Sequence, residues 1–475
     1  MMRTENSDAI VVGSGPNGLA AAIRLAQAGM PVTVFEASDT PGGGVRSADL
    51  LFPGVTHDIC SSVYPMAVCS PFFRTLPLQQ YGVEWVNPPL AAAHPLDDGS
   101  AAVLETSLPA TAASLGDDGE AYIRMVGPLV ERWQDLLDDS FAPLHFPEHP
   151  FLLARFGLMG LQPAATLARS RLRTVAARAL FAGLAAHSML PLEFIGTSAP
   201  ALVLAMAAHV ASWPFVRGGA QNLTTALVRF LETLGGKVVT GHRVDSLDPF
   251  AAARLVLLDV TPRQLLTIAG DRLSHTYRTK LARFRYGMGS FKIDWVLDQP
   301  VPWIAEACRR AGTVHVGGTL EEIIASEASS WDGNPTHKPF VLFSQPSLFD
   351  PSRTVSGKHI AWGYCHVPSG YSGDVTESIE AQVERFAPGF KRAILARHVM
   401  SPADLERHNA NLIGGDIGAG APILSQLFLK PTASLYKTTI PGVFLCSAST
   451  PPAAGVHGMC GFFAAETALA WAKSN

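Results

Sequence analysis

The sequence predicts an α/β protein with at least two domains, one of which begins with a βαβ unit. Its 475 residues exceed one ordinary core, because domains average ~150 residues. Apolar residues make up 48% and charged residues 16% of the chain, and 36 basic and 40 acidic side chains give a net charge of -4. This composition is typical of a globular protein and excludes a disordered chain. The lack of excess positive charge argues against nucleic acid as a partner.

The N-terminal segment predicts a strand, a helix and a second strand. Short apolar runs indicate buried strands at Asp8 to Val12 and Val32 to Phe35, with a helix at Pro16 to Ala28 between them. Apolar residues spaced by three and four predict one amphipathic helix at Asp117 to Asp139. The other expected elements are helices at Gly219 to Leu234 and Gly461 to Lys473, and strands at Lys237 to Thr240, Leu255 to Asp259, Phe291 to Leu297 and Gly442 to Ser447.

The turn between the first strand and the helix has the spacing G-x-G-x-x-G. Gly13 permits the tight turn, Gly15 lets backbone approach a pyrophosphate, and Gly18 lets the helix pack closely on the strand. The helix N-terminus offers free N–H groups and a positive dipole to the phosphates. Glu36 ends the second strand, where a carboxylate can accept both ribose hydroxyls and would repel a 2'-phosphate. The pattern therefore predicts a dinucleotide site.

The residues after Glu36 distinguish the kind of dinucleotide. Gly42-Gly43-Gly44-Val45-Arg46 begins six positions later, and a glycine pair at this offset resembles the FAD-dependent phytoene desaturase and amine oxidase superfamily. Members carry arginine directly after the pair, whereas this chain has Arg46 two residues further on. The segments that extend the resemblance are Trp213 to Gly219, Gly235 to Val239, Val443 to Ser449 and Gly455 to Gly458. Val314 to Thr319 and Asn411 to Gly418 resemble its desaturase-like branch of pyridine nucleotide-disulfide oxidoreductase domain-containing proteins.

The resemblance implies a discontinuous, Rossmann-like FAD-binding domain with an inserted α+β substrate domain. The implied FAD-binding domain consists of residues 1–70, 205–270 and 425–475. The implied substrate domain consists of residues 71–204 and 271–424, with a helical part at about 115–204. The residues expected to bind FAD are Gly13, Gly15, Pro16, Asn17, Gly18, Glu36, Ala37, Gly43, Gly44, Arg46, Val244, Ser447, Gly455, Val456 and His457.

Two residues are candidates for catalysis. The segment Tyr286 to Trp295 resembles the amine oxidase strand whose lysine holds water at flavin N5, and this indicates Lys292. Asp294 projects from the same face of that strand, so an ion pair supporting the sheet is an equal alternative. His457 is the second candidate because its motif is expected to face the flavin, with a hydrogen-bonded core histidine as the alternative.

The remaining motifs exclude other kinds of site. Six cysteines are scattered without a C-x-x-C pair, which argues against a zinc site, a dithiol redox centre and a secreted disulfide framework. We therefore expect no metal. The run Gly415 to Gly420 has no strand before it and Pro422 after it, so we expect a loop rather than a second nucleotide fingerprint.

With the resemblance, these observations predict an enzyme: an FAD-dependent oxidoreductase that desaturates a hydrophobic, isoprenoid or lipid-like substrate by hydride transfer to flavin N5. Oxygen or a quinone is the expected electron acceptor. An amine oxidase producing an imine and hydrogen peroxide is an alternative that Lys292 favours, but Ala421 to Cys460 contains only Tyr436 and no tryptophan for an aromatic cage. A flavoprotein that binds or regulates a partner is a third hypothesis, because fold does not fix activity.

Two segments raise the question of membrane contact. Phe194 to Val216 has no charged residue, but its prolines and His209 favour a helix packed between domains over a membrane span. Phe151 to Leu190 has five arginines and no acidic residue, so it is either a solvated face over a core or a segment that docks on an anionic bilayer. Met1 to Asp8 is polar and unlike a signal peptide, which favours a cytoplasmic protein, membrane-associated if residues 151–190 dock.

Overall fold

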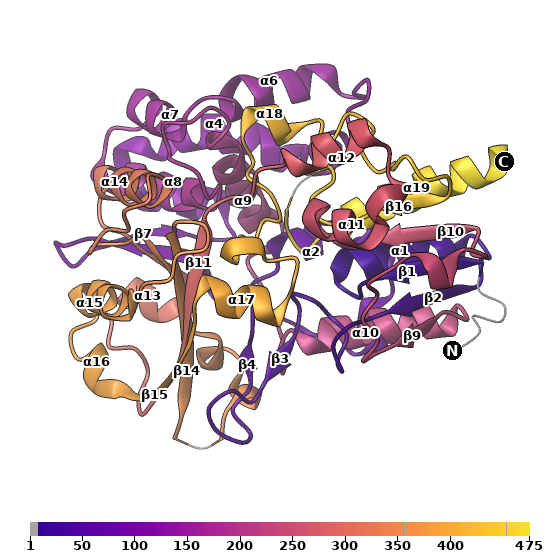
Figure 1. The fold of residues 1–475 in the computed structure, drawn as a ribbon. Coiled ribbons are helices and arrows are strands. Elements are labelled where there is room, and N and C mark those ends of the chain that lie inside the picture. The colour runs from indigo at the N-terminus through magenta and orange to yellow at the C-terminus, as the bar shows by residue number, and fades with distance from the viewer. Residues whose placement is uncertain (1–7, 356, 453) are drawn as a thin grey trace.

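The computed structural model describes residues 8–475 except 356 and 453, and it has two lobes, each built on one large sheet (Figure 1). A five-stranded sheet lies on the right of Figure 1 and a seven-stranded sheet on the left. The expectation drawn from Met1 to Asp8 falls, apart from Asp8, on residues outside the described range.

The five-stranded sheet is entirely parallel and combines strands from three distant parts of the chain. Its order is β16-β10-β1-β2-β9. These strands are β1 (Ala9–Val12), β2 (Val32–Phe35), β9 (Lys237–Val239), β10 (Leu255–Leu258) and β16 (Val443–Leu445). Each lies inside a segment for which the sequence predicted a strand. Apart from Thr33 and the exposed Lys237, their side chains are apolar on both faces, because helices cover both sides of a parallel sheet.

Helices cover the two faces of this sheet unequally. Ala9 and Val11 of β1 pack in the core under the first face, and Ile10 and Val12 in the core under the second. The helices are α1 (Pro16–Gln27), α10 (Gln221–Thr233) and α19 (Met459–Ser474) on the first face, and α11 (Pro262–Ala269) and α12 (His275–Ala282) on the second. Tyr277 of α12 belongs to this core, so the lobe continues past residue 270, where the sequence-based boundary lay.

The seven-stranded sheet has the order β15-β11-β14-β13-β12-β6-β7 and is antiparallel except between β12 and β6. Its strands are β6 (Leu90–Pro95), β7 (Ala101–Leu104), β11 (Gly289–Leu297), β12 (Ala311–Val316), β13 (Val341–Ser344), β14 (His359–Val367) and β15 (Ile394–Met400). One face packs on α13 (Glu306–Arg310), α15 (Thr376–Phe386) and α16 (Phe390–Ala393).

A layer of helices covers the other face of the seven-stranded sheet. It consists of α3 (Leu108–Ser114), α4 (Gly119–Glu131), α5 (Trp133–Ser140), α6 (Pro150–Gly160), α7 (Ala164–Arg171), α8 (Val175–Ala186), α9 (Ser198–Ala211) and α14 (Leu320–Trp331). The shorter elements are α2 (Pro65–Cys69), α17 (Pro402–His408), α18 (Leu424–Leu427), the pair β3 (Ser47–Ala48) and β4 (His57–Asp58), and the pair β5 (Trp85–Val86) and β8 (Phe215–Val216).

The single helix predicted at Asp117 to Asp139 is wrong, because the chain breaks between α4 and α5. Arg132 adopts φ −125° and ψ 38°, outside the helical region. Pro128 lies inside α4 and cannot donate to the carbonyl of Arg124, which instead accepts a hydrogen bond of 3.1 Å from Arg155 of α6. The apolar spacing continues across the break, so the pattern could not reveal it.

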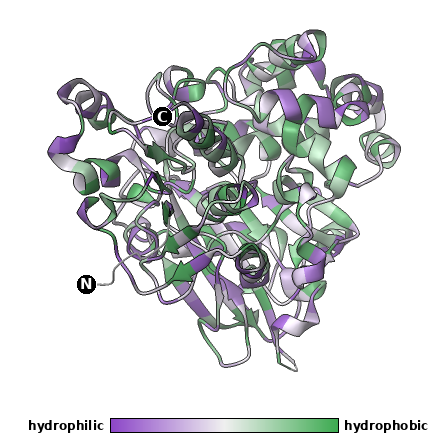
Figure 2. Cartoon of the chain, turned by 90° about the vertical axis from the view of Figure 1, so that its right-hand side faces the viewer, coloured by the Kyte–Doolittle hydropathy of each residue, from purple (hydrophilic) through white to green (hydrophobic). Residues whose placement is uncertain are grey.

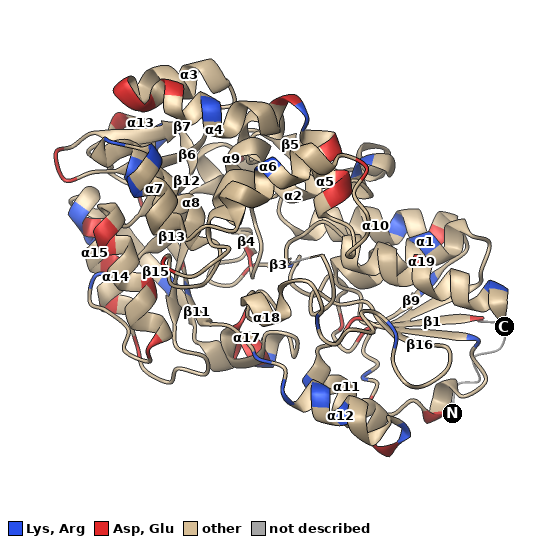
Figure 3. Cartoon of the chain, turned by 90° about the horizontal axis from the view of Figure 1, so that it is seen from above, with Lys and Arg blue, Asp and Glu red and all other residues tan. Residues whose placement is uncertain are grey.

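No single helix within the described part of the chain is both long and apolar enough to cross a bilayer. Helices α6 and α7 together have a suitable length and composition, but they are bent by 95° at their junction. The uncharged segment at 194–216 contains α9, a core helix of 14 residues, and the short strand β8. Hydrophobic residues occur on helices near the top of the molecule as well as in interior strands (Figure 2). Acidic and basic residues are interspersed over both lobes (Figure 3).

Candidate dinucleotide and substrate site

The glycine turn at the end of β1 has the close packing that its spacing predicts. Gly13 has φ +97°, and a side chain there would lie 3.1 Å from the Cβ of Asp259. A Cβ on Gly18 would lie 2.1 Å from the carbonyl oxygen of Gly13, so only glycine lets α1 approach the turn this closely. The N-terminal residues Gly15, Pro16 and Asn17 of the turn and α1 line a large cavity.

Glu36 lies at the end of β2 with its carboxylate held in place by three donors. Its Oε2 accepts hydrogen bonds from the backbone N–H of Ser14 at 2.9 Å and from the Ser14 hydroxyl at 2.5 Å. Its Oε1 accepts from the N–H of Ser38 at 2.9 Å. The side chain is buried but lines the cavity, which is the placement expected of a ribose-binding carboxylate.

The second glycine segment packs directly on the first. Gly43 has φ +57°, and its Cβ would lie 3.0 Å from the Cα of Gly15. Arg46 donates from Nε to the carbonyl of Gly43 at 3.0 Å and from a terminal nitrogen to the carbonyl of His408 at 3.0 Å. Burial lowers the pKa of Arg46, although the charges of Glu36 and Cys60 oppose this shift. The guanidinium is thus fixed by the backbone at the wall of the cavity.

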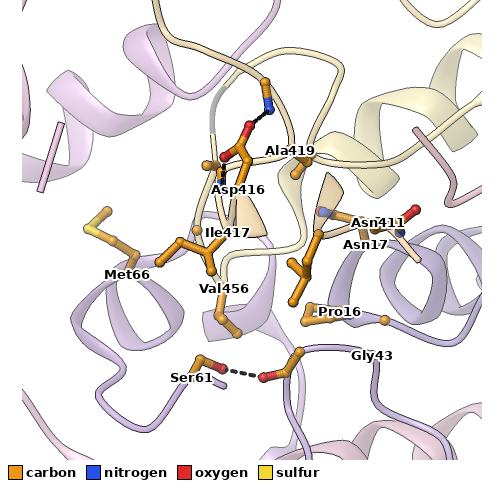
Figure 4. A pocket seen from close by; sticks show the side chains of 18 of the residues that line it. Pro16, Asn17, Gly43, Ser61, Met66, Asn411, Asp416, Ile417, Ala419 and Val456 are labelled. Carbon is orange, nitrogen blue, oxygen red and sulfur yellow. Dashed lines mark hydrogen bonds between the residues drawn. The ribbon is translucent and has the colours of Figure 1, made fainter. Parts of the chain in front are cut away.

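The cavity has a volume of about 1140 Å³ and runs between the two lobes. Pro16, Gly43, Ile417 and Val456 converge on it from four separate segments (Figure 4). Of the residues expected to bind FAD, those that line it are Gly13, Gly15, Pro16, Asn17, Glu36, Ala37, Gly43, Gly44, Arg46, Val244, Gly455 and Val456. A site of this size exceeds the ~300–1,000 Å³ typical of one ligand, so it has room for a dinucleotide and a second molecule.

The other three residues expected to bind FAD lie behind this wall. Gly18 donates its N–H to Asp259 at 3.0 Å. The Ser447 hydroxyl donates to the carbonyl of Val260 at 2.7 Å. The His457 ring is fully buried, accepts the Met459 N–H on Nδ1 at 3.0 Å, and stacks on Phe141 with ring centroids 5.0 Å apart. These three residues pack behind the cavity wall and do not form its surface.

Lys292 also lies outside the cavity lining. Its ammonium donates to both carboxylate oxygens of Asp294 and to the carbonyl of Asp58 at 3.1 Å. Although burial alone would raise the pKa of Asp294, the charges of Lys292 and His57 hold it below its usual value. The ammonium also lies 5.7 Å from the ring centroid of Trp362, which does line the cavity. This geometry is that of an ion pair between Lys292 and Asp294, which the sequence indicated as the alternative to a catalytic lysine.

Asp259 is a cavity residue that the sequence reasoning missed. It follows β10, which pairs with β1, so the two strands end side by side and Asp259 lies against Gly13 and Gly15. Burial raises the pKa of Asp259 to about 7, and the nearby charge of Glu36 adds to this rise, while the hydrogen bond from Gly18 opposes it. Its position after a predicted strand next to the first strand is the signal that could have revealed it.

The glycine-rich run at 415–420 forms a loop, as expected, and contributes to the cavity wall. Asp416 is buried and accepts hydrogen bonds from the N–H groups of Gly287, Gly418 and Gly420 at 2.7–2.8 Å. This places Ile417 and Ala419 at the cavity surface (Figure 4). Lys430, which the sequence did not indicate, also lines the cavity, and burial lowers its pKa.

The part of the cavity beyond the glycine turns is lined by two contrasting sets of residues. The first, which we call the inner pocket, consists of His187, Ser188, Thr313, Trp362 and Tyr364. The second, which we call the outer mouth, consists of Leu144, Phe156, Leu161, Val203, Leu204 and Phe428. The inner pocket is buried or half-buried, whereas Leu144, Leu161 and Phe428 are exposed. The cavity thus leads from an exposed apolar entrance to a buried polar end.

The residues present fit a flavin dinucleotide. The two glycine segments at Gly15 and Gly43 leave backbone bare where side chains would fill the space. Asn17, at the N-terminus of α1, lines the cavity and has a buried side-chain oxygen without a hydrogen-bond partner in the described residues, to which a hydroxyl of the ligand could donate. A phosphate-bearing ligand would find free backbone and the positive end of the α1 dipole there.

Comparison with known proteins agrees with this geometry. A family model described as an NAD(P)-binding Rossmann-like domain matches residues 11–74. The chain is 24% identical to pyridine nucleotide-disulfide oxidoreductase domain-containing protein 2 of Mus musculus, over 97% of this chain and 92% of that protein. It is 27% identical to a lycopene-forming phytoene desaturase of Pantoea ananas, over 97% of this chain and 98% of that protein.

Solved structures share the whole architecture. An oxidoreductase from Methanosarcina mazei superimposes with a TM-score of 0.65 at 14% identity, covering 97% of this chain and 99% of that one. Cyclohexylamine oxidase from Brevibacterium oxydans superimposes with a TM-score of 0.58 at 15% identity, covering 99% of both chains. At these identities the likeness establishes the fold, and the predicted α/β class with its Rossmann-like domain is confirmed.

Proposed function

Because the chain belongs to the FAD-dependent phytoene desaturase and amine oxidase superfamily, we propose that it removes hydrogen from an unactivated or allylic carbon of a hydrophobic, lipid-like substrate. The chain is an oxidoreductase, as its relatives are. The observation that carries the proposal is the single cavity that joins the glycine turns to an apolar entrance between α6 and α9. A substrate entering there reaches the cofactor site along one continuous cavity.

FAD is the cofactor we propose for this site. Glu36 would hold the adenosine ribose, the backbone at Gly13 to Asn17 the pyrophosphate, and Gly43, Gly455 and Val456 the ring-bearing half. When bound, FAD supplies the acceptor for the hydride that leaves the substrate carbon. The protein's own contribution is to exclude water and to fix the position of the substrate. The buried side chains of Trp362 and Trp213, which line the cavity, are suited to this role.

A lipid-like substrate is better supported than an amine. An ammonium group needs an unpaired carboxylate or an aromatic cage. None of the five inner-pocket residues is acidic, and Asp416 is already bound by three backbone N–H groups. Tyr436, the only tyrosine between Ala421 and Cys460, is buried away from the cavity and donates to the carbonyl of Pro451.

We further propose that the substrate enters from a membrane surface. The loop before α6 and α6 itself expose Leu144, Phe146, Phe151 and Leu158 at 69%, 88%, 90% and 76% of their surface. Leu424, Phe428 and Leu429, in and after α18, are also about half exposed. Leu144 and Phe428 line the outer mouth, and the other side chains lie on the same two segments of the chain. Isolated exposed apolar residues are ordinary, whereas a group of them beside a cavity entrance indicates a binding surface.

The test of the function is flavin reduction without oxygen. Purified protein that carries FAD is mixed anaerobically with isoprenoid, fatty-acyl and amine substrates, and bleaching of the 450 nm band is followed. We expect a lipid-like compound to reduce the flavin at about 1 s⁻¹ or faster, in the range of enzymatic turnover. Reduction by amines alone would favour the amine oxidase, and no reduction by either class would favour a partner-binding flavoprotein. Adding oxygen or a quinone afterwards identifies the electron acceptor.

A further inference from the structure

The inner pocket contains buried polar groups that nothing in the protein satisfies. The hydroxyls of Ser188 and Thr313 and the indole N–H of Trp362 are buried and have no hydrogen-bond partner within the described residues. All three residues line the cavity. An unsatisfied buried polar group costs ~1–3 kcal/mol, and such groups are rare in native structures. Three such groups on residues that line one cavity therefore indicate a ligand that supplies the missing partners.

Two of these groups come together because strands β12 and β14 present them on the same face of the seven-stranded sheet. Thr313 of β12 is followed at the next residue on its face by His315, and Trp362 of β14 by Tyr364. The rings of Trp362 and Tyr364 are nearly parallel, at 5°, with centroids 6.2 Å apart. His187 and Ser188, directly after α8, close the pocket from the helical side. The result is a wall of hydrogen-bonding and aromatic groups at the end of an apolar cavity.

The inner pocket is uncharged. Burial lowers the pKa of His187 to about 3 and that of His315 well below its usual value, so both imidazoles are neutral near pH 7. Their Nε2 atoms lie 3.1 Å apart, which requires one to donate and the other to accept. Burial raises the pKa of Tyr364, which therefore keeps its proton. The nearest ammonium, that of Lys292, is paired with Asp294 behind Trp362.

We propose that the inner pocket binds an uncharged oxygen-bearing group, a hydroxyl or a carbonyl, at one end of an otherwise apolar substrate whose chain extends to the outer mouth. Thr313 and Ser188 can donate to or accept from such an oxygen, and Trp362 can only donate. The inference rests on the proposed function for the presence of a lipid-like substrate. It narrows that substrate from a pure hydrocarbon to an amphiphile with a neutral head.

The test uses three probes that share one tail: 1-octanol, octylamine and octanoate, titrated by calorimetry at pH 7.5 into the protein as purified. We expect 1-octanol to bind most tightly. Thr313→Val removes the hydroxyl while keeping the shape, and Ser188→Ala removes the second hydroxyl. Each should weaken 1-octanol binding by about 5- to 10-fold, which is the ~1 kcal/mol of one hydrogen bond.

Ser198→Ala is the matched control. Ser198, in α9, also has a buried hydroxyl without a partner in the described residues, but it does not line the cavity. This variant should change 1-octanol binding by less than 2-fold, and thermal melting of all three variants checks that they fold. Tightest binding of octylamine or octanoate would overturn the proposal. So would undetectable 1-octanol binding, or binding that neither pocket variant weakens.

The proposed function can be refuted independently of the inner-pocket inference. Flavin content is measured by absorbance at 450 nm and turnover by anaerobic reduction, and neither is needed for the calorimetric comparison. A protein that selects 1-octanol through Thr313 but reduces no flavin would retain the inner-pocket inference and refute the oxidoreductase substrate class. A protein that oxidises lipids but binds the three probes equally well would support the proposed function and refute the inner-pocket inference.

Discussion

Gly43 is the residue whose replacement most directly tests the cofactor site. Its φ of +57° is strained for any side chain, and a Cβ would press on the Cα of Gly15 at 3.0 Å. Gly43→Val should therefore separate the two glycine segments and reduce bound FAD at least 10-fold, measured as the ratio of absorbance at 450 and 280 nm. The protein should remain folded, because the change lies at the cavity wall.

Gly29→Val is the control that separates the effect of backbone strain on stability from the effect of a blocked cofactor site. Gly29 follows α1 with φ +84°, and its Cβ would meet nothing within 4 Å. This variant carries the same kind of backbone strain away from the cavity, so it should lose stability but keep its FAD. Equal FAD content in the two variants would contradict the placement of the cofactor between Gly15 and Gly43.

Lys292 can be tested as a structural partner of Asp294. Lys292→Met leaves a buried carboxylate whose remaining partner, His57 Nδ1, is 3.6 Å away, so we expect a loss of about 3–5 kcal/mol in the free energy of unfolding. Adding Asp294→Leu removes the stranded charge and should recover most of the loss. Urea denaturation measures both effects.

Flavin reduction by the double variant then decides the role of Lys292. Because the ammonium lies outside the cavity lining, we expect a rate within about 2-fold of that of the unmodified protein. A stable, FAD-containing double variant that reduces its flavin 10-fold or more slowly would make Lys292 a catalytic residue after all.

Asp259 should make the stability of the flavin-free protein depend on pH. Its pKa is raised from 3.8 to about 7 in the folded state, first by burial and then by Glu36. Below about pH 4 the carboxyl is protonated in both states, and its contribution to stability is fully present. As the pH rises towards 7 the unfolded chain releases this proton while the folded protein keeps it, so stability falls by on the order of 3–4 kcal/mol.

Asp259→Asn should abolish that fall, since the amide oxygen can still accept the Gly18 N–H. The variant should match the unmodified protein at pH 4 and exceed it by about 2–4 kcal/mol at pH 8.5, measured by urea denaturation. Asp39→Asn, at an exposed carboxylate near the same site, is the control and should show no such difference. A constant gap between Asp259→Asn and the unmodified protein at both pH values would contradict the assignment.

At the scale of elements, local patterns predicted the nucleotide-binding strands but not the substrate pocket. Gly13, Gly15 and Glu36 obey fixed spacings within one βαβ unit, so one stretch of sequence contains the whole signal. The inner pocket instead combines Ser188, Thr313 and Trp362, which become neighbours only through the register of β12, β13 and β14 and their packing on α8. No local periodicity encodes that register, because each residue in its own strand resembles an ordinary core position.

Arg353 holds three distant elements together in a buried ion network. It donates to Asp58 of β4 at 2.6 Å, to Asp350 at 3.0 Å and to the carbonyl of Val216 in β8 at 2.7 Å. All three charged side chains are fully buried. Arg353→Met should therefore cost about 3–5 kcal/mol in unfolding free energy, because two buried carboxylates lose their cation.

Arg124→Met is the comparison for this network. The Arg124 side chain pairs with Glu120 on the surface of α4, with both residues more than two-thirds exposed. Exposed pairs of this kind contribute ~0–1 kcal/mol, so the variant should be nearly as stable as the unmodified protein. A loss for Arg353→Met as small as that for Arg124→Met would mean that the network does not stabilise the junction of the lobes.

At the scale of the whole molecule, the cavity exists only because both lobes form. The parallel sheet supplies its nucleotide end and the seven-stranded sheet supplies the inner pocket. The sequence indicated the first end through its glycines and suggested membrane contact through the arginines of Phe151 to Leu190. Within that segment, however, α8 is mostly buried, and the most exposed apolar side chains, Phe151 and Leu158, belong to α6. The exposed apolar residues are thus stronger evidence for membrane contact than the arginines are.

Vesicle flotation tests this membrane proposal with a matched pair of triple variants. Phe146→Ser, Phe151→Ser and Leu158→Ser together remove three side chains that are 76–90% exposed on α6 and the loop before it. Ile304→Ser, Val355→Ser and Leu395→Ser remove three that are 44–56% exposed elsewhere on the surface. Inserting one large apolar side chain into lipid contributes ~1.5–3 kcal/mol, so the first set should lower partitioning at least ~100-fold.

We expect the unmodified protein and the second variant to float with vesicles of phosphatidylcholine and anionic phosphatidylglycerol, and the first variant to stay at the bottom of the gradient. Higher salt should weaken the binding only partly, because it screens the exposed arginines Arg169, Arg171 and Arg173 but not the apolar contact. Binding lost entirely in salt would assign it to charge, and equal flotation of the two variants would place the contact elsewhere. In either case the exposed apolar side chains of α6 and of the loop before it would not be the membrane contact, and the proposed entry of substrate from the bilayer at the outer mouth would be refuted.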